Sequence, residues 1–170
     1  YDIEDLNYRN KLFEPKIEDI IEKQNINNDL DSETSNSIRN KVIMVAGGAG
    51  SIGSVLIERL SKLSPNKIIV IDKDEFGIFN LKKKFTNSKK FIFKLINTSD
   101  KFFLENIFKK FKPDIVYNAA AYKHVSIVEE NVGYAVHNNI ITAINICELC
   151  IKYNTKISLL VSTDKAVNPK

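Results

Sequence analysis

The sequence has little that indicates an oxidising compartment, a membrane span or a polyanionic partner. Cys147 and Cys150 are its only cysteines, too few for the disulfide framework of a small secreted domain. No apolar run approaches the roughly 20 residues of a membrane helix, and no signal peptide is visible. The net charge of +4 comes from 25 basic and 21 acidic residues scattered along the chain. This charge is too mild and too dispersed to indicate a nucleic-acid partner.

Two local features, a C-x-x-C spacing and a lysine-rich stretch, could indicate a functional site, but we interpret both as structural. The spacing C-x-x-C is typical of redox pairs, but those lie at a helix N-terminus, whereas Cys147 and Cys150 fall late in a helix-patterned segment. We predict two buried, small apolar side chains. The densest basic stretch, Lys82 to Lys84 with Lys89 and Lys90, is interpreted as a solvated helix end and loop. No cluster of residues predicts a metal site.

The chain predicts one folded domain with a polar extension before it. Hydrophobic residues make up 44% and charged residues 27% of the sequence, as in soluble globular domains. Residues 1–23 could form one short amphipathic helix, and residues 24–40, rich in Asn, Asp and Ser, predict a linker or mobile loop. The folded domain is expected to span residues 41–170.

The domain is organised around residues 41–59, which read as an apolar run, a glycine cluster and a helix. Gly47, Gly50 and Gly53 stand at G-x-x-G-x-x-G spacing, which turns a strand sharply into a helix and lets the backbone approach a pyrophosphate. Ser51 and Ile52 open the helix with Gly53, so free N–H groups and the positive end of the helix dipole would face the phosphates. The stretch predicts a dinucleotide site.

An acidic residue in the expected place supports that prediction. Asp72 ends a second apolar run, nineteen residues after Gly53, where a dinucleotide fold uses a carboxylate to accept the ribose hydroxyls. The alternative is a solvated residue at a strand end. An Asp there repels a 2′-phosphate and favours NAD over NADP, although Lys73 beside it could weaken that preference.

Strand-like and helix-like segments alternate through the rest of the domain. The expected strands are residues 41–46, 67–72, 90–96, 114–119 and 156–162, and the expected helices are residues 51–63, 75–85, 100–111 and about 133–153. This pattern predicts an α/β fold with a doubly wound, Rossmann-like parallel sheet of order 3-2-1-4-5. Its ligand crevice would lie at the carboxyl ends of strands 1 and 4. Ala119 and Ala120 would then lie against the cofactor, or would simply allow close helix packing.

Two segments leave alternatives open. In the helix of residues 133–153, the apolar face that we expect to cover the sheet consists of Ala135, Val136, Ile140, Ala143, Ile144, Cys147 and Ile151. Asn138 and Asn139 interrupt that helix, and Asn139 is either a polar clamp near the cofactor or an exposed residue. After the last strand, Ser162, Thr163, Asp164 and Lys165 supply hydroxyls, an acid and a base. The same four residues also suit a turn or a helix cap.

Three motifs carry a resemblance to a known family: the glycine turn with its SIGS sequence, NAAAYKHV from Asn118 to Val125, and STDKAVNP from Ser162 to Pro169. They resemble the nucleotide-sugar 4,6-dehydratases of capsule, lipopolysaccharide and flagellin-glycan synthesis, which include CapD-like proteins and form an extended branch of the short-chain dehydrogenase/reductases. Residues 3–15 also resemble the segment that precedes the dinucleotide domain in large, membrane-anchored members.

The resemblance implies a reaction and its residues. Family members convert UDP-N-acetylglucosamine or a similar UDP-sugar to a 4-keto-6-deoxy sugar, with NAD, or NADP, as the hydride carrier. By resemblance, Thr163 would hydrogen-bond the sugar, Asp164 would be the general acid and Lys165 the general base. Lys123 would reach both cofactor and substrate. Asn97 stands where the family has an aspartate near the adenine, and an amide can still make that bond.

The resemblance also bounds what the chain would do. Lys170 precedes the helix, strands and sugar-binding subdomain of the family, so we expect the chain to hold a cofactor but to be inactive alone. Full-length members are expected to be homo-oligomers in the cytoplasm, or at the cytoplasmic face of the inner membrane where the protein is membrane-anchored. A 4-epimerase or reductase of the same superfamily, and a non-catalytic NAD-binding module, remain as alternatives.

Overall fold

The computed structural model describes residues 32–86 and 88–162. The chain divides into two units, residues 1–32 and residues 33–170, and the fold below belongs to the second. The helix expected within residues 1–23 and the segment Thr163 to Lys165 lie outside the described residues.

Five parallel strands form one sheet. The strands are β1 (Val42–Ala46), β2 (Lys67–Asp72), β3 (Phe91–Leu95), β4 (Ile115–Asn118) and β5 (Ile157–Leu160). Their spatial order is β3-β2-β1-β4-β5, which confirms the predicted topology and fold class. Because β1 lies at the centre with β2 and β4 as neighbours, the winding reverses beside it, and a crevice opens at the carboxyl ends of these strands.

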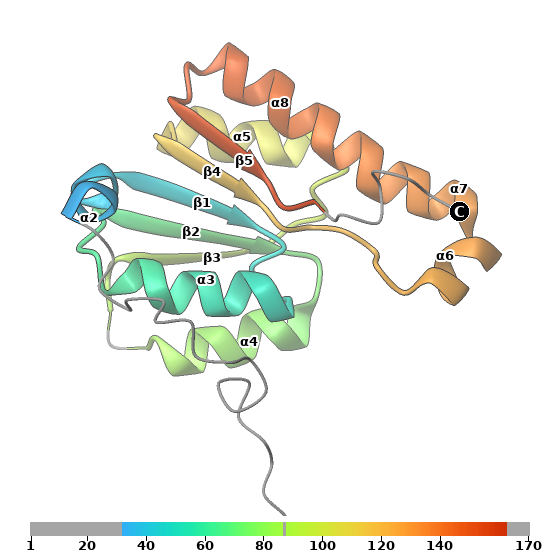
Figure 1. Cartoon of the computed structure of the whole chain (residues 1–170), viewed down its shortest axis with the longest axis horizontal. Helices are drawn as coiled ribbons and strands as arrows, with labels where there is room; N and C mark the ends of the chain where they lie inside the picture. The colour runs from blue at the N-terminus through green and yellow to red at the C-terminus, as the bar shows by residue number, and fades with distance from the viewer. Residues whose placement is uncertain (1–31, 87, 163–170) are drawn as a thin grey trace, which may run out of the picture. The chain divides into compact units, whose positions relative to one another are not determined.

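Helices cover both faces of the sheet (Figure 1). Helices α3 (Ser51–Ser61) and α4 (Glu75–Lys84) lie on one face, and α5 (Lys101–Phe111) and α8 (Thr142–Lys152) lie on the other. Alternate residues of β1 enter the two cores: Ile43 and Val45 pack with α3 and α4, whereas Met44 and Ala46 pack with α5 and α8. Burial on both faces explains why β1 reads as a continuous apolar run.

The predicted linker of residues 24–40 is wrong for its last part. Residues Ser32–Ile38 form a helix, α2, with Glu33 in its first turn, where a negative charge favours the helix dipole. Ile38 is 3% exposed and belongs to the same core cluster as Ile43 and Leu60. The burial of Ile38 stabilises the packing of this otherwise polar helix against the domain.

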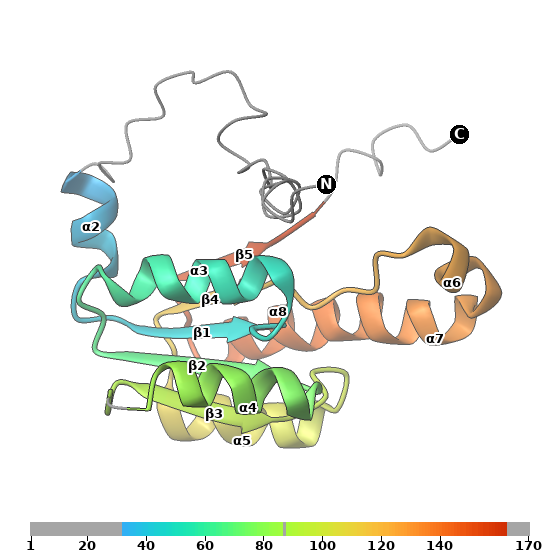
Figure 2. The same cartoon turned by 90° about the horizontal axis from the view of Figure 1, so that it is seen from below.

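The single helix predicted for residues 133–153 is also wrong in detail. The structure has α6 (Val125–Glu130), α7 (Val132–Val136), a π-helical turn η2 (His137–Ile141) and then α8. Helices α6 and α7 extend beyond the carboxyl edge of the sheet, as both views show (Figures 1 and 2). A π-turn holds an extra residue, so it shifts the faces of the helices on either side of it.

That shift changes which side of α8 is buried. Ile146, Leu149 and Cys150 face the sheet, whereas Ile140 and Ile144, predicted to cover it, are 51% and 45% exposed. Cys150 is buried as predicted, but Cys147 is exposed. Apolar residues therefore lie on two sides of the segment from η2 to α8, and the side predicted from the sequence to be buried is the exposed one.

The last strand, β5, is exposed along its whole length, including Leu159 and Leu160.

Among the helices of residues 32–86 and 88–162, none combines the length and the apolar character that crossing a bilayer requires.

Candidate functional site

The glycine turn joins β1 to α3 at the carboxyl edge of the sheet. The N–H groups of Gly47 and Gly48 both donate to Ile71 O, at 2.9 and 3.1 Å. Gly47 has a φ of +72°, and a Cβ there would lie 2.6 Å from backbone atoms of Ala119 and Ala120. A Cβ on Gly53 would lie 2.2 Å from Gly47 O. Both positions therefore require glycine for close backbone packing.

Gly50 is less crowded than these two glycines. A Cβ there would meet only Gly47 O, at 3.3 Å, and no other atom within 4 Å. Gly50 is the residue before α3, with Ser51 and Ile52 exposed at the start of that helix. Free N–H groups at a helix N-terminus next to bare backbone make a cradle for an anion such as a phosphate.

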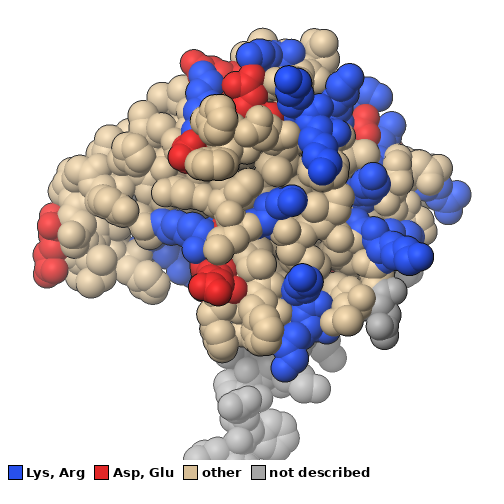
Figure 3. All heavy atoms as spheres, turned by 180° about the vertical axis from the view of Figure 1, so that it is seen from behind, with Lys and Arg blue, Asp and Glu red and all other residues tan. Residues whose placement is uncertain are grey.

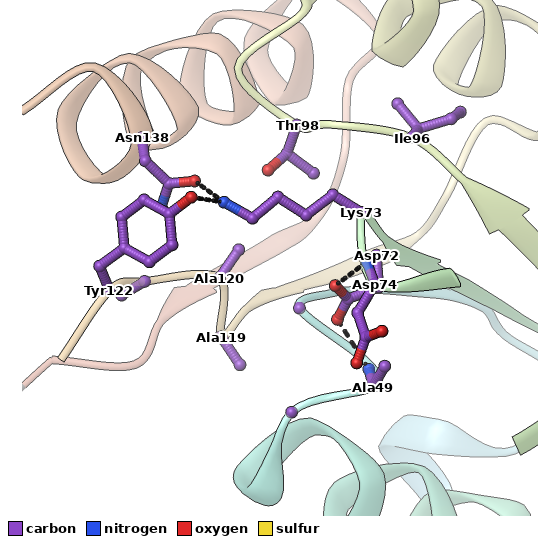
Figure 4. Close-up of a pocket in the computed structure, with 13 residues that line it drawn as sticks. Ala49, Asp72, Lys73, Asp74, Ile96, Thr98, Ala119, Ala120, Tyr122 and Asn138 are labelled. Carbon is purple, nitrogen blue, oxygen red and sulfur yellow. Dashed lines mark hydrogen bonds between the residues drawn. The ribbon is translucent and has the colours of Figure 1, made fainter. Parts of the chain in front are cut away.

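Asp72 fixes the turn from the neighbouring strand. Its Oδ2 accepts a hydrogen bond from Ala49 N at 2.9 Å, and its Oδ1 accepts one from Asp74 N at 3.0 Å. Each carboxylate oxygen keeps a further lone pair for a ligand. The carboxylate thus has a structural role that the sequence analysis did not anticipate, and it still faces the crevice (Figure 4).

A cavity of about 180 Å³ lies between this turn and the ends of β2, β3 and β4. It is lined by Gly47, Ala49, Gly50, Asp72, Lys73, Asp74, Ile96, Thr98, Ala119, Ala120, Ala121, Tyr122 and Asn138. Of the residues predicted to bind a cofactor, five therefore line the same cavity: Gly47, Gly50, Asp72, Ala119 and Ala120. Because the side chains of Ala119 and Ala120 are only methyl groups, a flat ligand can lie against the backbone there.

Lys73 crosses the cavity (Figure 4). Its Nζ donates to Asn138 Oδ1 at 2.8 Å and to the Tyr122 hydroxyl, and it lies 3.7 Å from the centre of the Tyr122 ring. A ligand pocket usually exceeds about 300 Å³, so a dinucleotide would need the Lys73 side chain to swing aside. Long lysine side chains move readily because they have four rotatable bonds.

Asn139 clamps the backbone of Tyr122, and its expected contact with a cofactor stays a prediction. Its Oδ1 accepts from Tyr122 N at 2.8 Å and its Nδ2 donates to Tyr122 O at 3.1 Å. Asn138, which is 7% exposed, donates from Nδ2 to Asn139 Oδ1 at 2.9 Å. Both amides lie on the π-turn, which lets two successive residues face the same loop. The clamp holds the backbone of the β4–α6 loop rather than the crevice itself.

The loop held by Asn139 carries Lys123. Lys123 Nζ donates to Ser51 Oγ at 3.2 Å and so reaches from the end of β4 to the start of α3. Lys123 also lines a second cavity of about 440 Å³ with Tyr122, Ile127 and Tyr134, among others. Ala121 and Tyr122 line both cavities.

The loop after β3 is fixed to α8 by buried polar side chains. Asn145 Nδ2 donates to Ser99 O at 2.9 Å, and the hydroxyls of Thr98 and Thr142 lie 3.2 Å apart. Asn97, expected near an adenine, uses its Oδ1 to accept from the N–H and hydroxyl of Ser99. Its neighbours Ile96 and Thr98 line the cavity instead.

Thr163, Asp164 and Lys165 lie outside the described residues, so their expected roles stay predictions. The strand before them ends beside the crevice, because Val161 N donates to Asn118 O at 2.9 Å. Tyr122 and Asn138 were not predicted as site residues. Tyr122 lies within the recognised NAAAYKHV motif, but nothing in the sequence marks a π-turn at Asn138.

A parallel sheet of order 3-2-1-4-5, with a glycine turn and an acidic β2 terminus at its switch point, defines the Rossmann-like dinucleotide-binding class. Within that class, residues 43–170 match the family described as polysaccharide biosynthesis protein. The chain belongs to this family.

Curated relatives are longer than this chain. It is 36% identical over 158 residues to the probable polysaccharide biosynthesis protein EpsC of Bacillus subtilis, covering 91% of this chain and 26% of the relative. It is 35% identical over 130 residues to a UDP-N-acetylglucosamine 4,6-dehydratase (inverting) of Campylobacter jejuni, covering 76% of this chain and 38% of that enzyme. The chain thus spans about a quarter to two fifths of the length of these relatives.

Solved structures share the fold. The UDP-glucose 4-epimerase of Thermotoga maritima, solved with UDP-glucose, superposes with a TM-score of 0.63 at 30% identity, over 73% of this chain and 38% of that one. WbmG of Bordetella bronchiseptica, solved with NAD and UDP, gives a TM-score of 0.57 at 27% identity, over 69% of this chain and 36% of that one.

Proposed function

We propose that this chain forms the dinucleotide-binding part of a nucleotide-sugar 4,6-dehydratase that acts on UDP-N-acetylglucosamine or a similar UDP-sugar in polysaccharide synthesis. The observation that supports it most is the crevice in which Gly47, Gly50, Asp72 and Ala119 meet at one edge of the sheet. The similarity to a 4,6-dehydratase over 76% of this chain supports the reaction class.

The residues present fit NAD. The bare backbone at Gly50 and the N–H groups at the start of α3 suit a pyrophosphate, and Asp72 would accept from ribose hydroxyls. The carboxylate would repel a 2′-phosphate, which favours NAD over NADP. When bound, this cofactor supplies reversible hydride transfer.

Substrate binding and the proton transfers would be carried out by side chains of this protein. Lys123, oriented through the Asn139 clamp, would contact both cofactor and sugar. Thr163 would hydrogen-bond the sugar, Lys165 would accept the C5 proton, and Asp164 would protonate the hydroxyl that leaves C6. In the same proposal the full-length protein is a homo-oligomer that works in the cytoplasm or at the cytoplasmic face of the membrane.

Cofactor binding and turnover are tested separately. Titration of the purified chain with NAD and NADP should show saturable binding of both, with NAD the tighter ligand. Turnover is tested in the full-length protein with UDP-N-acetylglucosamine, by NMR detection of a new C6 methyl group. Asp164→Asn and Lys165→Ala should abolish that methyl signal and leave NAD binding intact. A full-length protein that binds no dinucleotide would refute the proposal.

A 4-epimerase is the second candidate, because a UDP-glucose 4-epimerase is 30% identical over the shared fold. An epimerase would use the same cofactor site without the acid and base pair at Asp164 and Lys165. Product analysis separates the two reactions: an epimer keeps its 6-hydroxyl group, whereas a 4,6-dehydratase product carries a methyl group there.

A further inference from the structure

The basic residues that look scattered in the sequence gather at one edge of the folded sheet. Every helix that crosses back over the parallel sheet begins at its carboxyl edge and ends at its amino edge. The last turns of these helices are basic, with Arg59 in α3, Lys82, Lys83 and Lys84 in α4, Lys109 and Lys110 in α5, and Lys152 in α8. The helix ends therefore bring together cations that are far apart in the chain.

The strand starts add to the same edge. Lys67 is the first residue of β2, Lys89 and Lys90 directly precede β3, and Lys156 precedes β5. All four are exposed. In Figure 3 this edge is on the right, and Lys and Arg side chains crowd that half of the surface. We call this surface the amino-edge basic surface.

Acidic residues cancel only part of this charge. Those at the amino edge include Glu58, Glu105 and Asp114, and each pairs with a lysine of the same edge: Lys84, Lys152 and Lys156. Asp72, Asp74 and Asp100 lie instead at the carboxyl ends of their strands or at helix starts there. Cations near helix C-termini favour the helix dipole, but Lys67, Lys89 and Lys90 lie at strand starts, where no such gain applies.

We propose that the amino-edge basic surface binds anionic lipid headgroups, so that the domain lies on a membrane surface with its dinucleotide crevice facing away. The cations are almost all lysines, which act as flexible point charges and suit a diffuse anionic surface better than a patterned one. Single-stranded nucleic acid would also need exposed rings for base stacking. At this edge Phe85, Phe91, Phe111 and Tyr153 pack against the two cores instead.

The geometry keeps the two functions apart. The cavity with Gly50 and Asp72 opens at the carboxyl ends of the strands, the opposite edge of the same sheet. A membrane bound at the amino edge would leave the crevice accessible to a water-soluble nucleotide sugar. Lipid binding is therefore independent of cofactor binding, and each can be measured while the other is lost.

Vesicle sedimentation of the purified chain tests the proposal. We expect binding to phosphatidylcholine vesicles that contain phosphatidylglycerol, no binding to phosphatidylcholine alone, and release at high salt. The variant with Lys82→Gln, Lys83→Gln, Lys89→Gln and Lys90→Gln removes four cations that are exposed and, within the described residues, form no ion pair. Its vesicle affinity should fall by about a hundredfold to a thousandfold.

The matched control changes the same four lysines to arginine and keeps the charge, so it should bind vesicles as the original does. NAD titration should be unchanged in both variants, and thermal unfolding should be unchanged in the arginine variant. The proposal is overturned if the original chain ignores anionic vesicles, or if the glutamine variant binds them equally well. It is also overturned if the chain binds single-stranded RNA or an acidic polypeptide in the same salt range but not vesicles.

Discussion

Asp72 Oδ2 accepts a hydrogen bond from Ala49 N at 2.9 Å, so the acidic end of β2 holds the glycine turn that follows β1. The same carboxylate accepts from Asp74 N, and in the proposed function it would also accept from a ribose hydroxyl. Under that proposal, one side chain would both fix the shape of the glycine turn and recognise the ribose.

Replacing Asp72 should therefore affect stability and binding together. Asp72→Ala leaves two backbone N–H groups without this acceptor, and we expect a loss of about 1–3 kcal/mol in the free energy of unfolding. NAD affinity should fall as well. Asp72→Asn keeps one acceptor oxygen and should recover part of the stability, while it weakens discrimination against NADP. Urea unfolding and dinucleotide titration measure both effects, and unchanged NAD affinity in Asp72→Ala would contradict the assigned role.

Substitutions at Gly47 and Gly50 should have different effects: the first should mainly reduce stability and the second should mainly reduce NAD affinity. Gly47→Ala places a Cβ about 2.6 Å from the backbone of Ala119 and Ala120 at a φ of +72°, so we expect the protein to lose stability severely. Gly50→Ala brings its methyl group within 3.3 Å of Gly47 O alone, so it should fold with a much smaller loss of stability than Gly47→Ala. The methyl group would stand where a pyrophosphate approaches. We expect at least about a tenfold loss of NAD affinity, from the loss of one or two close phosphate contacts.

Gly133 provides the matched control for these two variants. It lies in α7, and a Cβ there meets nothing within 4 Å. Gly133→Ala should keep NAD affinity unchanged and raise stability by up to about 1 kcal/mol, because alanine favours a helix. If Gly50→Ala and Gly133→Ala bind NAD equally well, the proposed phosphate cradle is wrong.

Asn139 should act as a positioning residue through the loop that it clamps. Asn139→Ala removes both hydrogen bonds to the Tyr122 backbone, so Lys123 would no longer be held toward Ser51. We expect weaker NAD binding and faster amide hydrogen exchange confined to residues 119–124. Asn131→Ala, which removes one exposed side-chain bond to Ile127 O, is the control and should leave that exchange unchanged. Equal exchange in both variants would show that the clamp does not order the loop.

The fold was predictable because its pattern is local and repeated. Buried strands read as apolar runs, as in Ile68 to Ile71, and the glycine turn marks where the first strand ends. Parallel order then follows from alternation with helices and from right-handed crossovers. The grouping of Gly47, Gly50, Asp72 and Ala119 was likewise predictable, because these residues lie at ends of strands that meet at one edge.

What the sequence did not show depends on contacts between distant segments. The π-turn at Asn138 and Asn139 has no sequence signature, and it reversed the predicted face of α8. Thr142 and Asn145 look like surface residues, but they are buried because Thr98 and Ser99 supply partners. The amino-edge basic surface was missed for the same reason: lysines scattered in sequence become neighbours only once the helices are placed on the sheet.

The two cysteines should differ in reactivity. Burial raises the pKa of the Cys150 thiol, although hydrogen bonds with Ser158 and Thr155 oppose the shift, whereas Cys147 is exposed. Because the thiolate is the reactive form, iodoacetamide should modify Cys147 first and Cys150 only when the protein unfolds. Mass spectrometry of the native protein, with Cys147→Ser as control, checks the order. Rapid modification of Cys150 in native Cys147→Ser would contradict its burial.

Glu105 joins α5 to the end of α8 and should give the fold an acid-sensitive contact. Hydrogen bonds from Lys152 and Tyr153 lower the pKa of Glu105, and Lys101 nearby adds to the effect. Because the folded pKa lies below the unfolded one, the contact stabilises the protein above the unfolded pKa and is lost as the pH falls through the folded pKa. Glu105→Gln should therefore melt at a lower temperature than the original at neutral pH, and the difference should shrink in acid.

Tyr153→Phe is the control for this contact, because it keeps the Glu105 and Lys152 pair and removes only the hydroxyl bond. It should show a smaller fall in melting temperature with the same direction of pH dependence. Melting curves recorded by circular dichroism from neutral to acid pH measure all three proteins. A deficit of Glu105→Gln that stays constant across this range would mean that side-chain packing, not the ionised carboxylate, holds the two helix ends together.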